Sequence, residues 1–158
     1  MLKILRSAPD ELADDEYRAL FDPATRLAKP ALLRDRLETA LAHASRRDRM
    51  TGLLFVHVEI PADLAPAQGK LLDLLPLIAG RLRSAVRPGD TVARVGELDF
   101  VMVVNELADA GDLYLITERV QQVIGVRVFL DESRSVLSAE VETVIAHPGD
   151  RAVDLLTR

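Results

Sequence analysis

Four side chains of the sequence have the types that metal and phosphate chemistry requires. His57 and Glu59 lie at the polar end of an apolar run, and Glu97 and Asp99 flank Leu98. Carboxylate oxygens are the ligands that hard cations such as Mg²⁺ prefer, whereas a neutral imidazole is a poor ligand for them. Glu59, Glu97 and Asp99 could therefore form a metal site, or they could be solvated charges on a hairpin.

The elements that position these side chains follow from the hydrophobic pattern. Apolar residues at helical spacing predict helices over 30–47 and 108–124. A further helix is expected to begin at Leu74 and to end near Val86, because Pro76 is tolerated only in a first turn. Asp73 would then be its N-cap.

Continuous apolar runs predict the strands. One strand is expected over 52–60, and a hairpin is expected from two strands over 91–95 and 99–104. Weaker signals indicate an acidic helix over 9–20, strands near 126–130 and 136–146 with a turn at Asp131–Ser135 between them, and a final helix. This order predicts an α+β fold with a ferredoxin-like β-α-β-β-α-β core, in which helices flank a central, mostly antiparallel sheet.

Composition excludes several classes of function. The formal net charge of −5 argues against a nucleic-acid partner, which would need a basic face. No run of about 20 apolar residues predicts a membrane span, and the start of the chain is too short for a signal peptide. The absence of cysteine fits a cytoplasmic protein. The three histidines lie too far apart in sequence to form a local metal motif.

Several motifs in order resemble the GGDEF (diguanylate-cyclase-like) domain family. They are DPATRLAKPALL at 22–33, LLFVHVEI at 53–60, RLRSAVRPGD at 81–90, RVGELDF at 94–100 and VLSAEVETVIAHPGDRAVDLL at 136–156. The resemblance implies a core of the nucleotidyl-cyclase type. It also implies an N-terminal connector helix over 1–21 and a degenerate GGDEF domain over 22–158, with its final helix truncated.

The resemblance also implies that the chain is not an enzyme. Active members use carboxylates to hold divalent metals and make cyclic di-GMP from GTP, and the two ligand positions match His57 and Leu98 here. A leucine is no metal ligand, so no metal or other cofactor is expected, and His57 is expected to be a partly buried core histidine. The family's guanine-binding positions fall near Ala65 and Leu72. The degenerate active-site positions are His57, Glu59, Gly96, Glu97, Leu98, Asp99 and Phe100.

One family feature is intact, an R-x-x-D pair formed by Arg87 and Asp90. In the family this pair resembles an inhibitory site for cyclic di-GMP, and Arg119 matches an arginine that often assists. A guanidinium can bond guanine O6 and N7 or a phosphate, and a carboxylate can accept from guanine N–H groups. We expect the turn to expose Arg87 and Asp90 to such a ligand, although Arg-Pro-Gly-Asp is also a good turn by itself.

These observations predict a non-catalytic domain in cyclic di-GMP signalling that binds cyclic di-GMP at Arg87, Asp90 and Arg119 or docks a partner protein. Three alternatives stay open. The chain could be a pure interaction or homodimerisation scaffold without nucleotide, or a weak residual cyclase that uses Glu59 and Asp99 with Glu97. It could also be a ferredoxin-like domain unrelated to the family.

Overall fold

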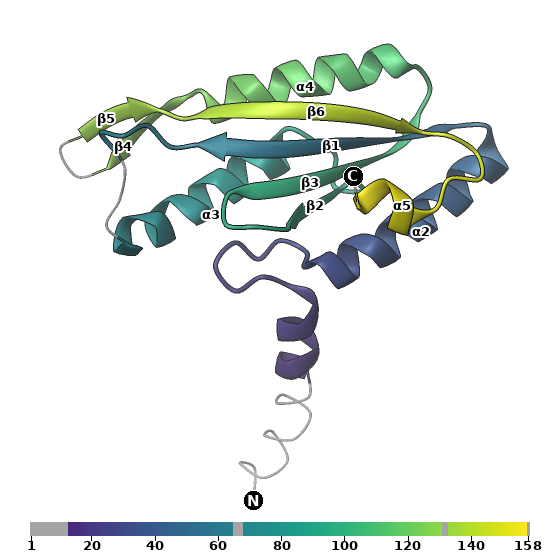
Figure 1. Cartoon of the computed structure of the whole chain (residues 1–158), viewed down its shortest axis with the longest axis horizontal. Helices are drawn as coiled ribbons and strands as arrows, with labels where there is room; N and C mark the ends of the chain where they lie inside the picture. The colour runs from purple at the N-terminus through teal and green to yellow at the C-terminus, as the bar shows by residue number, and fades with distance from the viewer. Residues whose placement is uncertain (1–12, 65–67, 131–132, 158) are drawn as a thin grey trace, which may run out of the picture.

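A four-stranded antiparallel sheet carries the helices of this chain (Figure 1). The computed structural model describes residues 13–64, 68–130 and 133–157. Residues 13–20 are helical, and the predicted residues 9–12 of that helix lie outside the described part. The other elements are α2 (Pro30–Arg47), β1 (Met50–Glu59), α3 (Gln68–Ser84), β2 (Thr91–Arg94), β3 (Asp99–Leu107), α4 (Ala110–Ile124), β4 (Arg127–Leu130), β5 (Ser133–Val136), β6 (Ser138–Ala146) and α5 (Ala152–Leu156).

The strand order confirms the predicted core. The sheet runs β2-β3-β1-β6, and β1 pairs antiparallel with both β3 and β6. With α3 after β1 and α4 after β3, the chain follows the β-α-β-β-α-β order of a ferredoxin-like fold. The loop of the β2–β3 hairpin therefore lies at one end of the sheet, and the turn at 87–90 lies at the other end of the same two strands.

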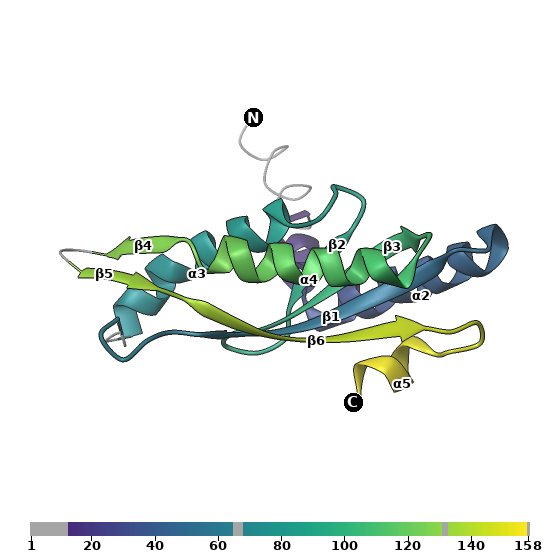
Figure 2. The ribbon, with the colours of Figure 1, turned by 90° about the horizontal axis from the view of Figure 1, so that it is seen from above.

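The two faces of the sheet are covered by different helices. In Figure 2, α3 and α4 lie on one side of β1 and β6, and α5 lies on the other side. Alternation along β1 explains this division, because Leu54 and Val56 pack with α3 and α4 while Leu53 and Phe55 face α2 and α5. Gly52 allows close packing at one end of β1, since a Cβ there would lie 2.7 Å from Leu107 Cδ1.

The start of α3 corrects the prediction. The helix begins at Gln68 rather than Leu74, so Asp73 is not its N-cap and Pro76 lies inside the helix. Pro76 is exposed, so its ring lies on the side of the helix away from the core. The buried stripe on the opposite side, which includes Leu75 and Ile78, holds the helix together across this position.

The segment before β6 also differs from the prediction. The expected turn at Asp131–Ser135 is partly a strand, because β5 pairs with β4 from Arg127↔Val136 to Leu130↔Ser133. The buried Leu137 separates β5 from β6, and β6 begins at Ser138 rather than at 136. Residues 131–132 lie outside the described part. Among the residues that are described, no helix is long and apolar enough to cross a bilayer.

Candidate functional site

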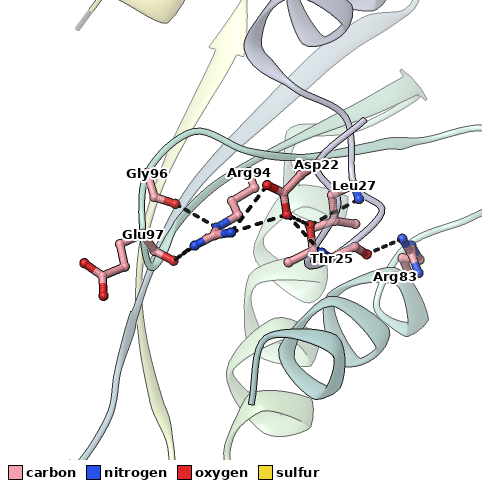
Figure 3. Close-up of polar contacts among 7 residues, drawn as sticks. All are labelled: Asp22, Thr25, Leu27, Arg83, Arg94, Gly96 and Glu97. Atoms are coloured by element: carbon pink, nitrogen blue, oxygen red, sulfur yellow. Dashed lines mark hydrogen bonds and ion pairs between the residues drawn. The ribbon is translucent and has the colours of Figure 1, made fainter. Parts of the chain in front are cut away.

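Arg94 ties the β2–β3 hairpin loop to the turn that precedes α2. Figure 3 shows its guanidinium between the carboxylate of Asp22 and the backbone of the loop. The Arg94 Nη1 atom lies 3.3 Å from Asp22 Oδ2, while Nε and Nη2 donate to the carbonyls of Gly96 and Glu97 at 3.1 and 3.0 Å. Both side chains of the ion pair are largely buried, at 17% and 18% exposure. One arginine therefore holds the hairpin loop in place.

Asp22 also organises its own turn. Its Oδ2 atom accepts hydrogen bonds from the backbone N–H and the hydroxyl of Thr25, at 2.9 and 2.7 Å. Arg83 of α3 donates to the carbonyl of Thr25, which links the turn to the helix layer (Figure 3). Burial raises the pKa of the Asp22 carboxyl, but the Thr25 hydrogen bonds and the Arg94 charge together lower it below its ordinary value.

His57 lies in a row of charged side chains across three strands. It pairs with Asp99 of β3 on one side and Glu140 of β6 on the other, and its Nδ1 atom is 2.7 Å from Asp99 Oδ1. The His57 side chain is 50% exposed, so the prediction of a core histidine is wrong. The hydrogen bond to Asp99 raises the pKa of His57, burial opposes this increase, and the charges of Asp99, Glu140 and Glu59 add to it.

The other residues of the hairpin loop do not complete a magnesium site. Leu98 is half-buried and packs against the core, with its carbonyl accepting from Val58 N–H at 3.0 Å. Glu97 is exposed. Glu59 of β1 pairs with Ser138 of β6, the strand on the other side of β1 from the hairpin. Across the described ranges, no three His, Asp or Glu side chains are grouped so that they could hold a metal ion.

The donor set therefore does not fit a divalent cation of the kind that the family resemblance implies. The two positions at which the resemblance implies metal ligands hold an imidazole that is hydrogen-bonded to a carboxylate, His57, and an aliphatic side chain, Leu98. Gly96 fits closely against Asp99, because a Cβ at Gly96 would lie 2.7 Å from Asp99 Oδ2. Phe100 is a core residue at 1% exposure. Of the two guanine-binding positions, Leu72 is exposed on α3, and Ala65 lies outside the described residues.

The turn at 87–90 places its two charged side chains differently. The Arg87 side chain is 65% exposed, but that of Asp90 is only 3% exposed, which corrects the expectation that the turn exposes both. Asp90 is turned inward because its two oxygens accept from the backbone N–H groups of Arg87 and Asn105, at 3.0 and 2.9 Å. Arg87 Nη2 donates to the carbonyl of Asn105 at 2.7 Å. Asp90 thus fixes the turn that carries Arg87.

The structure brings Arg87, Asp90 and Arg119 to one hollow of about 370 Å³ between the turn and α4, here named the arginine hollow. Arg119 Nη1 donates a hydrogen bond to the carbonyl of Ala85 at 3.2 Å. Leu115 of α4 adds an exposed apolar wall, at 56% exposure. Two guanidinium groups and an apolar surface therefore face the hollow, which Glu106 and Asp112 also line, and Glu106 is paired with Arg47.

Sequence reasoning did not assign roles to Asp22, Arg94 and Asn105. Asp22 and Arg94 each open one of the motifs that carry the resemblance, so their positions were an available signal. Asn105 had no comparable signal, because its backbone meets Asp90 only through the pairing of β2 with β3.

Comparison with known proteins gives a consistent result. A family model described as diguanylate cyclase, GGDEF domain, matches residues 19–158. The bifunctional diguanylate cyclase/cyclic di-GMP phosphodiesterase MucR of Pseudomonas aeruginosa is 34% identical over 134 residues, which is 84% of this chain and 19% of MucR. This chain therefore spans about a fifth of the length of that curated relative.

Two solved structures are similar in fold. The GGDEF domain of TpbB (YfiN) from Pseudomonas aeruginosa superposes with a TM-score of 0.76 at 27% identity, covering 87% of this chain and 82% of that one. The coiled coil and GGDEF domain of DgcB from Caulobacter crescentus, in complex with c-di-GMP, has a TM-score of 0.81 at 15% identity. That match covers 99% of this chain and 85% of the other.

Proposed function

The chain belongs to the diguanylate cyclase GGDEF domain family, and on this premise we propose that it is a non-catalytic domain of cyclic di-GMP signalling. In this proposal it binds cyclic di-GMP at the arginine hollow and does not synthesise it. The observation that carries the proposal is that Arg87 and Arg119 line one hollow, and that Asp90 fixes the turn that carries Arg87. A cytoplasmic location is part of the proposal, since the chain has no cysteine.

The chemistry of the hairpin supports the absence of synthesis. Phosphoryl transfer to a sugar hydroxyl requires charge neutralisation at the triphosphate, which hard cations on carboxylates provide. Here Asp99 Oδ1 is hydrogen-bonded to His57, and the side chain of Leu98 has no oxygen. The carboxylates of Asp99 and Glu140 stand on either side of His57 without a basic residue among them, which disfavours a nucleoside triphosphate.

The geometry at the arginine hollow supports binding. Arg87 uses Nη2 for the Asn105 carbonyl, and its Nε atom lies 3.7 Å from Asp90 Oδ2. Because the side chain is 65% exposed, we expect its remaining N–H groups to reach a guanine edge or a phosphate. Arg119 approaches the same hollow from α4. Asp90 acts as a positioning residue, because its oxygens are engaged with backbone N–H groups. The structure of DgcB in complex with c-di-GMP gives a precedent on the same fold.

Titration calorimetry with cyclic di-GMP tests the proposal. We expect saturable binding to the wild-type chain, and we expect Arg87→Ala and Arg119→Ala each to weaken it about tenfold or more, as loss of a charge-assisted contact would. Arg34→Ala is the matched control, because Arg34 is an exposed arginine that pairs with Glu38 on α2. Absence of binding to the wild type, or equal affinity of wild type and Arg87→Ala, would reject the arginine hollow as the site.

A further inference from the structure

A second hollow lies on the sheet face that α2 and α5 share, at the end where the hairpin loop is. It has a volume of about 650 Å³ and is here named the acidic hollow. In Figure 2, α5 lies on this side of the sheet. The walls come from five elements and the hairpin loop, with Pro30 and Leu33 from α2 and Leu156 from α5 among them.

The strand register explains how the acidic hollow is built. Two neighbouring rows of side chains cross its floor, since Asp99, His57 and Glu140 are paired across β3, β1 and β6. In the next row, two residues earlier in β1, Phe55 lies between Val101 and Glu142 in the same way. The floor is therefore apolar around Phe55 and Val101, and the side formed by β6 is acidic.

The charges around the acidic hollow have one sign. Its carboxylates are Asp99, Glu140 and Glu142, and no Lys or Arg stands among the described residues that line it. Of the lining residues that the structure describes, His57 alone can become a cation, and it is hydrogen-bonded to Asp99. The apolar part includes Val95 of the hairpin loop, which is 42% exposed and has no polar role of its own.

We propose that the acidic hollow is a docking site for a basic, apolar segment of a partner protein, which inserts an aliphatic or aromatic side chain flanked by lysine or arginine. Charge complementarity selects this occupant, because a cationic segment meets Asp99, Glu140 and Glu142 while its apolar side chain meets Phe55 and Val101. Nucleotides are repelled by the same carboxylates. A second copy of this chain placed face to face would set these carboxylates against one another.

The docking site is separate from the arginine hollow. The hairpin loop and the turn at 87–90 lie at opposite ends of β2 and β3, and the two hollows share no lining residue. The proposal therefore does not depend on cyclic di-GMP binding, and each of the two proposals can fail alone.

The test uses defined synthetic peptides and the full 158-residue chain. The probe is a short labelled peptide in which lysine and arginine alternate with leucine and phenylalanine. Two matched peptides replace its basic residues with glutamate or its apolar residues with serine. We expect fluorescence anisotropy to show binding of the probe and not of the two matched peptides. In NMR spectra of the chain, the amide shift changes that the probe causes should centre on His57, Val95 and Glu140.

Charge reversal locates the contact. Glu140→Lys/Glu142→Lys is expected to weaken the probe about tenfold or more, and the neutral, nearly isosteric Glu140→Gln/Glu142→Gln a few-fold. Asp14→Lys/Asp15→Lys, on the exposed face of the helix at 13–20, makes the same change in net charge and should leave affinity within about twofold. Unfolding curves check that each variant remains folded, and the glutamine pair keeps the test valid if the lysine pair does not.

Three results would overturn the proposal. The first is equal binding of the glutamate peptide, and the second is an equal loss of affinity in the Asp14/Asp15 variant. The third is self-association of the wild-type chain in sedimentation that Glu140→Lys/Glu142→Lys abolishes, because the acidic hollow would then be covered by a second copy.

Discussion

Replacing Arg94 with alanine should destabilise the domain more than removal of any exposed arginine. The substitution breaks an ion pair with Asp22 in which both side chains are more than four-fifths buried, and it removes the donors to the carbonyls of Gly96 and Glu97. Exposed ion pairs contribute about 0–1 kcal/mol, whereas breaking a fully buried pair costs roughly 3–5 kcal/mol. The partial burial of this pair places the expected loss at about 2–3 kcal/mol.

Urea unfolding and thermal melting measure this loss. For a domain of this size about 1 kcal/mol corresponds to roughly 2–4 °C, so the melting temperature of Arg94→Ala should fall by roughly 4–12 °C. Arg34→Ala, which removes one partner of an exposed i,i+4 pair on α2, should change the free energy of unfolding by less than about 0.5 kcal/mol. A double-mutant cycle with Asp22→Asn isolates the coupling between the two side chains.

The stabilisation that Asp22 contributes should depend on pH. Because the pKa of Asp22 is lowered in the folded state, its stabilisation is present above the unfolded pKa and is lost as pH falls through the folded pKa. The difference between wild type and Arg94→Ala should therefore shrink in strong acid. A loss for Arg94→Ala no larger than that for Arg34→Ala, or zero coupling in the cycle, would refute the role of Arg94 in holding the loop.

Two further predictions follow from other contacts. The pKa of His57, followed by NMR, should lie above its ordinary value and should fall in Asp99→Asn. Because the folded pKa is raised, the stabilisation from His57 is present below the unfolded pKa near 6.5 and is lost as pH rises through the folded pKa. An unchanged pKa in Asp99→Asn would contradict the assignment. Gly52→Ala should destabilise the domain by about 1–3 kcal/mol in urea unfolding, because its Cβ would lie 2.7 Å from Leu107 Cδ1 and 2.8 Å from Leu113 Cδ1, and a neutral outcome would show that the side chains of this core layer can move aside.

Much of the fold could be predicted from the sequence because its main elements have regular apolar periods. Leu33 and Leu37 recur at helical spacing and are buried in α2, and the continuous run of β1 is buried on both faces, as expected for a central strand. Pro76 misled the prediction because a local preference was weighed without the buried stripe beside it. The pairing of Ser133–Val136 with β4 had no signal in its own residues.

The candidate site was less accessible to sequence reasoning. The motif order pointed to Arg87, Asp90 and Arg119 together, and they do line one hollow. Residue types alone could not show that Asp90 is turned inward, because the groups that hold it include the backbone of Asn105, 15 residues away. The exposure of His57 likewise depends on how far α2 and α5 extend over the sheet, which no local pattern of β1 encodes.

The most direct measurement of whether this domain makes cyclic di-GMP is a turnover assay with GTP and Mg²⁺ or Mn²⁺, followed by chromatography of the products. An active family member run alongside provides the positive control. Because the resemblance implies metal ligands at His57 and Leu98, which do not fit Mg²⁺, the chain is expected to leave GTP unchanged and to yield no cyclic di-GMP. Cyclic di-GMP that accumulates with time and enzyme concentration, and that disappears in Glu59→Gln or Asp99→Asn, would contradict the account.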